Sequence, residues 1–150
     1  MHRQPTVLIV DDLVFVRRML KGLLRQQGFK CYEASSLSQA LDSYHLFRPD
    51  LVIVGTLHSG MTSVIAIEAL KRFDPRARVI CCTEEATRSQ VIASIRAGAE
   101  DFVARPFKQD RFFRAVQGQR PAPAPVEEEE IAPPTPITGY APTELELIAF

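Results

Sequence analysis

Polar side chains capable of chemistry stand at the ends of short apolar runs in this sequence. Asp11 and Asp12 follow the first run, Thr83 ends the fourth, and Arg105 follows the fifth. Two adjacent carboxylates indicate a divalent cation, because hard cations take oxygen ligands. The alternative is a pair of solvated loop acids, with Asp12 capping the next helix. Arg105 could neutralise the acid pair, hold an anion, or form a plain structural ion pair.

Five apolar runs alternate with five helical patterns, and this alternation predicts the elements that position those side chains. The predicted strands are 6–10, 30–34, 51–54, 79–83 and 101–104. The predicted helices are 16–27, a second that ends near 47 with Ser36 or Ser38 as its cap, 61–73, 87–97 and 110–117. Strict alternation with short loops predicts an α/β fold with a doubly wound parallel sheet of flavodoxin-like order 2-1-3-4-5. Ligands of such sheets bind beyond the carboxyl ends of the strands.

The composition favours one soluble, cytoplasmic domain over a secreted or membrane protein. The chain of 150 residues has no net charge, so nothing global suggests a nucleic acid or a membrane as partner. Its start lacks a signal-peptide pattern, and no apolar run approaches the roughly 20 residues that span a bilayer. We expect Cys31, Cys81 and Cys82 to be buried, reduced thiols, because they lie in apolar runs without metal-ligand spacing.

The charge divides the chain into a basic body and an acidic tail. Residues 1–118, the predicted domain, carry 17 basic and 12 acidic side chains, whereas residues 119–150 carry one arginine and six glutamates. We expect 119–142, rich in proline and glutamate, to be a disordered linker. Residues 143–150 are either a short docking helix, the start of a further segment, or a disordered end. The tail could fold back on the body or bind a basic partner.

Five segments in register resemble the receiver domain of two-component response regulators, over residues 5–117. They are VLIVDD at 7–12, PDLVIV at 49–54, GM at 60–61, VICCT at 79–83 and AGAEDFVARPF at 97–107. The resemblance implies an acid pair that holds magnesium together with an aspartate ending the third strand, which accepts a phosphoryl group from a histidine kinase. It also implies a switch hydroxyl after the fourth strand, a lysine before the proline, and a switch aromatic in the fifth strand.

The sequence matches this pattern in part and departs from it at two positions. The matching residues are Asp11 and Asp12 as metal ligands, Thr83 as switch hydroxyl and Phe102 as switch aromatic. Gly55 stands at the acceptor position and Arg105 at the lysine position. Glycine offers no carboxylate to be phosphorylated, so we expect no catalytic residue. We expect the metal site to be weakened and mostly empty, with weak magnesium binding at best.

Arg105 is expected to replace the metal by a longer, bidentate bridge to the acid pair. Other phosphoryl acceptors remain open in the loop after the third strand, where Thr56, His58 and Ser59 lie. Asp50 precedes that strand and should lie at the opposite edge of the sheet.

The sequence therefore predicts an atypical bacterial receiver that is not an enzyme and acts as a phosphorylation-independent protein-interaction module in signalling. The expected partner face comprises the fourth helix, fifth strand and fifth helix, with Arg88, Arg96, Arg111 and Arg114 as a basic region. A protein partner or a second copy could bind there, and the acidic tail could also take part. The alternative is a conventional phosphorelay regulator modified at another residue or switched by another ligand. No helix-turn-helix follows, so nucleic acid is not an expected partner.

Overall fold

The computed structural model describes residues 3–57 and 62–118, which contain five strands and five helices in alternation. The strands are β1 (Thr6–Val10), β2 (Lys30–Ala34), β3 (Leu51–Val54), β4 (Val79–Thr83) and β5 (Asp101–Ala104). The helices are α1 (Val14–Gln26), α2 (Leu37–Phe47), α3 (Ser63–Phe73), α4 (Arg88–Ala97) and α5 (Gln109–Val116). All five strand predictions are confirmed to the residue.

The strands form one parallel sheet in the order β2-β1-β3-β4-β5, which confirms the predicted topology. The central strands β3 and β4 are buried along their whole length, as their unbroken apolar sequences require. The register sets Val10 beside Val54, and Val54 beside Cys81. Strands β1, β3 and β4 therefore reach the same edge of the sheet together.

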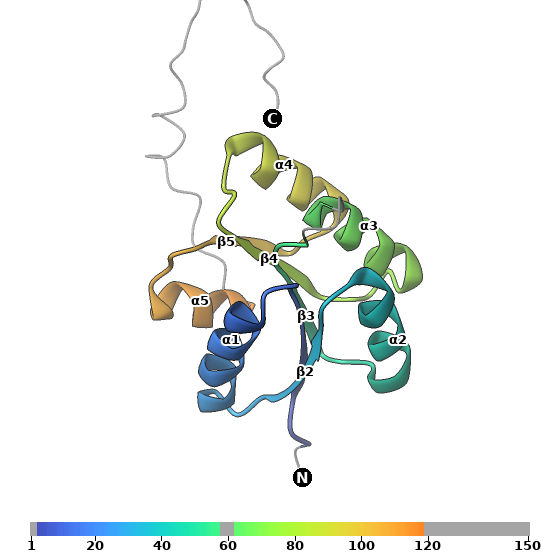
Figure 1. Cartoon of the computed structure of the whole chain (residues 1–150), viewed down its shortest axis with the longest axis vertical. Helices are drawn as coiled ribbons and strands as arrows, with labels where there is room; N and C mark the ends of the chain where they lie inside the picture. Colours follow the sequence, from blue (N-terminus) through green and yellow to red (C-terminus); the bar gives the residue numbers. More distant parts are fainter. Residues whose placement is uncertain (1–2, 58–61, 119–150) are drawn as a thin grey trace, which may run out of the picture. The chain divides into compact units, whose positions relative to one another are not determined.

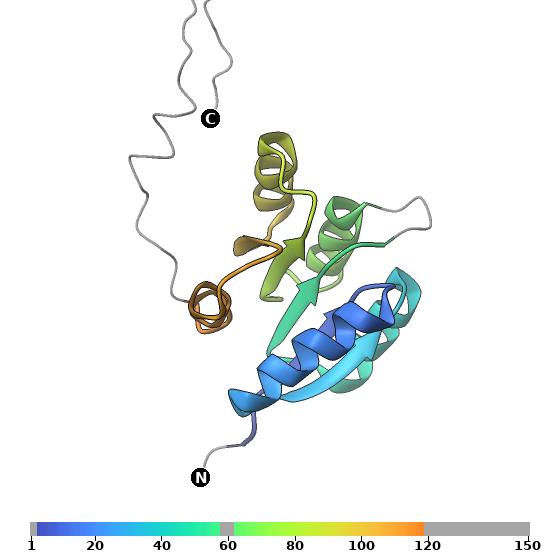
Figure 2. The ribbon, with the colours of Figure 1, turned by 60° about the vertical axis from the view of Figure 1, so that its left-hand side comes forward.

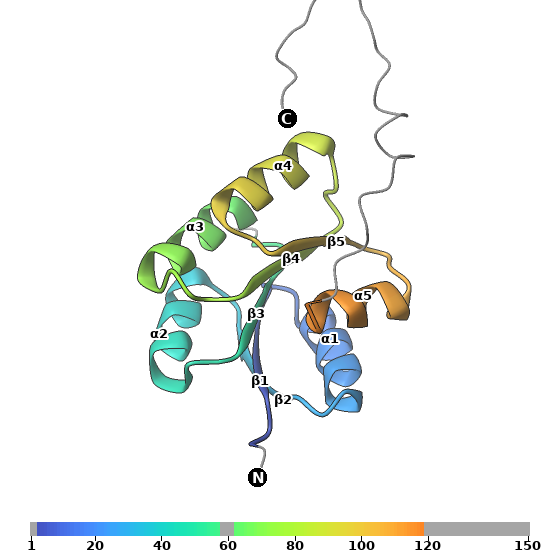
Figure 3. The same cartoon turned by 180° about the vertical axis from the view of Figure 1, so that it is seen from behind.

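Helices cover both faces of the sheet (Figures 1 and 3). On one face, α1 and α5 lie side by side and pack Leu20, Leu24 and Phe112 against the sheet. On the other face lie α2, α3 and α4, where α2 and α3 contribute Tyr44, Ile67 and other buried residues to a second core. Figure 2 shows the sheet between the two helical layers.

Side-chain caps and glycines set several helix boundaries. Ser36, not Ser38, caps α2 and accepts a hydrogen bond from the Gln39 N–H at 3.2 Å. Thr62 caps α3 in the same way, so this helix begins two residues later than predicted. Gly28 follows α1 with a φ of +88°, a backbone conformation that favours glycine.

The expectations for residues 119–142 and 143–150 lie outside the described part of the chain. Within that part, no helix is long and apolar enough to cross a membrane.

Candidate functional site

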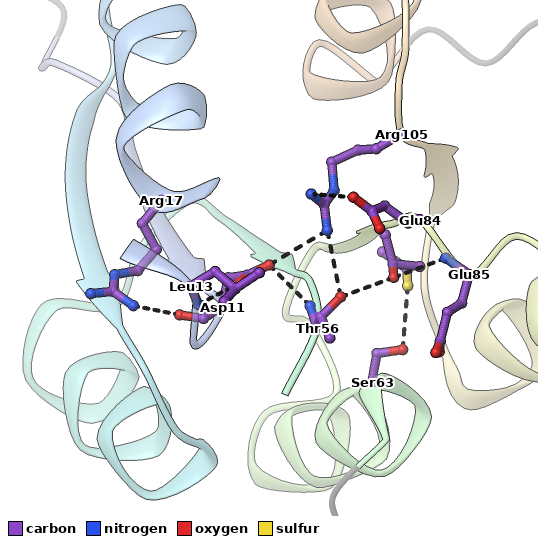
Figure 4. Close-up of polar contacts among 10 residues, drawn as sticks. Asp11, Leu13, Arg17, Thr56, Ser63, Glu84, Glu85 and Arg105 are labelled. Carbon is purple, nitrogen blue, oxygen red and sulfur yellow. Dashed lines mark hydrogen bonds and ion pairs between the residues drawn. The ribbon is translucent and has the colours of Figure 1, made fainter. Parts of the chain in front are cut away.

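The predicted site residues gather at the carboxyl edge of the sheet. Asp11 follows β1, Gly55 and Thr56 follow β3, Thr83 ends β4, and Arg105 follows β5. Backbone hydrogen bonds continue past the strand ends, since the Arg105 N–H donates to the Thr83 carbonyl at 3.0 Å. Figure 4 shows the side chains of Asp11, Thr56 and Arg105 pointing toward one another. The edge placement predicted from the sequence is therefore what the fold produces.

Asp11 is fully buried, and two backbone amides hold its carboxylate. Its Oδ1 accepts from the Leu13 N–H at 2.8 Å, and its Oδ2 accepts from the Thr56 N–H at 3.0 Å. Burial raises the pKa of Asp11, although these two N–H donors and the charge of Arg105 act in the opposite direction. The alternative of two solvated loop acids is therefore wrong for Asp11. Asp12 does not cap α1 either, because the residue at the cap position is Leu13, which offers no side-chain acceptor.

Gly55 leaves space that the Asp11 carboxylate fills. A Cβ at residue 55 would overlap Asp11 Oδ2, and it would lie 3.0 Å from Asp11 Cγ and 3.2 Å from the Cys82 carbonyl oxygen. Any side chain at this position therefore requires Asp11 to move or the backbone of β4 to shift. The glycine is required by this close approach and not by an unusual φ.

Arg105 stands over the site, and its guanidinium is divided between two acids. Its side chain is 9% exposed, with Nη2 at 3.9 Å from Asp11 Oδ2 and Nη1 at 3.8 Å from Glu84 Oε2. Its Nε is buried and has no hydrogen-bond partner. The predicted pairing of Arg105 with Asp11 is therefore present, but as one contact and not as a bidentate bridge. The Thr56 N–H already occupies the near oxygen of Asp11, and Glu84 attracts the other end of the guanidinium (Figure 4).

Thr56 joins the strand ends through its hydroxyl as well as its N–H. Its Oγ1 lies 3.2 Å from Thr83 Oγ1, and it accepts a hydrogen bond from Arg105 Nη2 at 3.5 Å. Thr83 Oγ1 in turn accepts from the Glu85 N–H at 3.3 Å. A hydroxyl residue directly after a buried strand is one sequence signal of this role, although from the sequence Thr56 is expected only as a candidate phosphoryl acceptor. Nothing in the sequence indicated that Glu84 would pair with Arg105.

The donor set at this edge does not suit magnesium, which binds several oxygens in near-octahedral geometry. Both Asp11 oxygens accept N–H groups, Gly55 contributes no oxygen, and the cation of Arg105 faces the acid. Within residues 3–57 and 62–118, no group of three or more acidic, histidine or cysteine side chains is arranged to hold a metal ion. Asp12 is partly exposed beside this group and has an interaction of its own.

Other predicted residues lie away from this cluster. Asp50 is at the opposite edge, as expected, where it accepts from the Thr6 N–H at 2.8 Å and from Arg3 Nη1 at 2.9 Å. Phe102 is partly buried against the core on the α2, α3 and α4 side. His58 and Ser59 fall outside the described residues.

The cysteines are free, and Cys81 and Cys82 are buried as predicted, whereas Cys31 is only partly buried. Burial raises the pKa of Cys82 to about 12, so this thiol stays protonated although the Arg105 cation is near.

The four arginines predicted to form a basic region are not equivalent. Arg88, Arg96 and Arg114 are exposed on α4 and α5. Arg111 is instead partly buried and held in place, since its Nη2 and Nη1 lie 2.8 and 3.1 Å from the two oxygens of Asp101. The same Nη2 donates to the Phe102 carbonyl at 3.0 Å. Arg111 is therefore committed to an intramolecular pair that ties α5 to β5.

Comparison with known proteins agrees with the fold and with the motifs. The family described as response regulator receiver domain matches residues 7–117. The chemotaxis protein CheY of Bacillus subtilis (strain 168) is 39% identical over 111 residues, which is 73% of this chain and 92% of that protein. CheY of Thermotoga maritima is 35% identical over 111 residues, with the same coverage of 73% and 92%.

Solved structures show the same fold. The receiver domain of NtrX from Brucella abortus superposes with a TM-score of 0.69 at 27% identity, over 75% of this chain and 97% of that one. A response regulator from Thermotoga maritima gives a TM-score of 0.69 at 26% identity, over 77% and 96%. The family match covers most of the chain, and it includes all the strands and helices described above except Thr6, the first residue of β1. This chain therefore belongs to the response regulator receiver domain family.

Proposed function

We propose that this receiver works without aspartyl phosphorylation, as a protein-binding module in a two-component signalling pathway. The observation that carries the proposal is Gly55. It takes the place after β3 where the receiver pattern has its phosphate-accepting aspartate, and the Asp11 carboxylate fills the adjoining space. Residue 55 provides no nucleophile, and the donor set around it favours Arg105 over magnesium.

The test is incubation of the full chain with magnesium and acetyl phosphate, followed by intact-mass measurement. A receiver that has an aspartate at the corresponding position is run in parallel as a positive control. The expected result is no phosphoryl adduct on this protein and full modification of the control. A stoichiometric adduct would overturn the proposal and return the protein to the conventional phosphorelay regulators. Peptide mapping would then decide among Thr56, His58 and Ser59 as acceptors.

The proposed partner is a protein that binds the face formed by α4, β5 and α5. Arg96 and Arg114 are exposed on its two helices, and Ile95, next to Arg96 on α4, is 42% exposed. Exposed arginines beside an apolar side chain suit an acidic protein surface. A second copy of this chain is the other candidate for the same face.

Site-specific photo-crosslinking tests this face in the organism that supplies the protein. The crosslinking group is placed at Ile95 and, as a control, at Ser38, which is exposed on α2. An adduct is expected from position 95 only, and it should disappear when Arg96→Glu and Arg114→Glu are added. Equal adducts from positions 38 and 95, or an adduct that survives both charge reversals, would contradict the proposed face.

A further inference from the structure

We propose that Thr56 is the residue that positions the segment between β4 and α4, through a relay of hydrogen bonds that begins at the buried carboxylate of Asp11. The relay has three links. Thr56 N–H donates to Asp11 Oδ2 at 3.0 Å, Thr56 Oγ1 meets Thr83 Oγ1 at 3.2 Å, and the Glu85 N–H donates to Thr83 Oγ1 at 3.3 Å. It runs from the end of β1, through the end of β3, to the first residues after β4 (Figure 4).

The donors and acceptors make the Thr56 hydroxyl the central link. Arg105 can only donate, and its Nη2 donates to Thr56 Oγ1 at 3.5 Å. The hydrogen of the Thr56 hydroxyl is therefore available to Thr83. Thr83 is 3% exposed, and a hydroxyl buried to this degree needs a partner within the protein. An apolar residue at position 56 would remove that partner while leaving the backbone link to Asp11 intact.

The position of α4 depends on this connection because the helix buries few apolar side chains and packs mainly along α3. Its one fully buried residue is Ser94, whose hydroxyl reaches the Cys81 thiol at 3.7 Å. The other helices on this face, α2 and α3, bury larger apolar side chains such as Tyr44, Ile67 and Leu70. A segment with few buried apolar contacts opens at a lower free energy, so a hydrogen bond at its start has more influence on its position. The relay ends two residues before Thr87, the residue that caps α4.

The relay gives a physical reason for a fixed partner face. It holds the β4–α4 segment from inside the molecule, by side chains that need neither metal nor phosphate. This inference rests on the proposed function in one respect: the relay sets the conformation of the α4–β5–α5 face, which is the proposed partner face. Thr56 acts through Thr83 and is therefore a positioning residue.

The experiment is amide hydrogen exchange on the full chain, read at residues 84–90. Thr56→Val keeps the shape of the side chain and the backbone N–H of residue 56, but it removes the hydroxyl. We expect exchange at 84–90 to accelerate on the order of five-fold, the effect of losing about one ordinary hydrogen bond. Thr56→Ser retains the hydroxyl and should exchange like the wild type. Ser38→Ala, on an exposed position of α2, controls for substitution itself.

A double-mutant cycle with Thr83→Val tests whether the two hydroxyls act through each other. If they do, Thr56→Val combined with Thr83→Val accelerates exchange no more than Thr83→Val alone. Wild-type exchange at 84–90 in Thr56→Val, or full additivity of the two substitutions, would overturn the relay. The exchange results do not depend on phosphorylation, and the acetyl phosphate experiment does not depend on the Thr56 hydroxyl. The relay and the proposed function can therefore fail separately.

Discussion

The carboxylate of Asp11 occupies the space that a side chain on residue 55 would need. Two backbone amides hold the acid there, at 2.8 and 3.0 Å, and the Arg105 guanidinium faces it from the end of β5. The glycine and the buried acid therefore form one packing unit, in which each defines the conformation of the other. This unit differs from a magnesium centre because residue 55 adds no carboxylate and the Arg105 cation faces the acid.

Replacing Gly55 by alanine should destabilise the protein. The new Cβ would overlap Asp11 Oδ2 and approach the Cys82 carbonyl to 3.2 Å, and overpacking of this kind costs about 1–3 kcal/mol. Urea unfolding followed by circular dichroism measures the change in the free energy of unfolding.

Gly22→Ala is the matched control for Gly55→Ala. Gly22 lies within α1 with nothing within 4 Å of its would-be Cβ, so alanine there should stabilise the protein by about 0.5–1 kcal/mol. Adding Asp11→Ala to Gly55→Ala should reduce the cost of the new methyl group. If Gly55→Ala were as stable as the wild type, the Asp11 carboxylate would not be confined against residue 55 as the structure indicates.

The stability of the protein should carry a pH dependence that originates at Asp11. Burial raises the pKa of Asp11 above the 3.8 of an exposed aspartate, so the folded state binds this proton more tightly than the unfolded chain. Asp11 therefore stabilises the fold most below pH 3.8. Its contribution falls as the pH rises from 3.8 through the folded pKa, and it is constant above that.

The measurement is the free energy of unfolding of the wild type and of Asp11→Asn across the acidic range up to neutral pH. The stability of the wild type relative to the variant should decrease as the pH rises. A relative stability that increases with pH would mean that Arg105 and the two amides outweigh burial and lower the pKa of Asp11.

Two arginines of α5 should respond very differently to substitution. Arg111→Ala removes both guanidinium contacts of the nearly buried Asp101 carboxylate, which keeps only the Phe102 N–H, and it removes a donor to the Phe102 carbonyl. The loss should cost about 1–3 kcal/mol. Arg114→Ala, three residues further along the same helix at an exposed position, should change stability by less than about 0.5 kcal/mol. Thermal and urea unfolding of both variants give the comparison. Equal effects would show that the Arg111–Asp101 pair contributes nothing beyond an ordinary surface charge.

Magnesium should not stabilise this protein. A metal that binds only the folded state stabilises it by an amount that grows with the logarithm of the metal concentration above the dissociation constant. Each Asp11 oxygen already accepts an N–H, Gly55 adds no carboxylate, and the Arg105 cation faces the acid. Thermal unfolding in millimolar magnesium chloride should therefore match unfolding in sodium chloride of equal ionic strength. A rise in the midpoint that grows with magnesium concentration and that Asp12→Asn abolishes would establish a metal site at this edge.

The strands, their order and the location of the site follow from the sequence alone. Short continuous β-branched and leucine runs favour strands buried on both faces. Their alternation with amphipathic segments makes a parallel doubly wound sheet the simplest packing. The position of Gly55 after the third run also shows, without coordinates, that residue 55 has no carboxylate to offer. Local rules were enough because each of these features depends on neighbours in the chain.

Only the tertiary structure decided which side chains meet at the site. Thr56 and Thr83 lie 27 residues apart in the sequence. Their hydroxyls come within 3.2 Å because Val54 pairs with Cys81 and each threonine lies two residues further along its chain. Arg105 turns partly to Glu84 and not wholly to the acid pair, because the Thr56 amide already occupies Asp11. Arg111 and Arg114 are the same residue type on one helix, and only the place of Asp101 on β5 distinguishes them. Which side chains pair within the protein depends on distances between residues that are remote in sequence. The packing of the whole fold sets those distances.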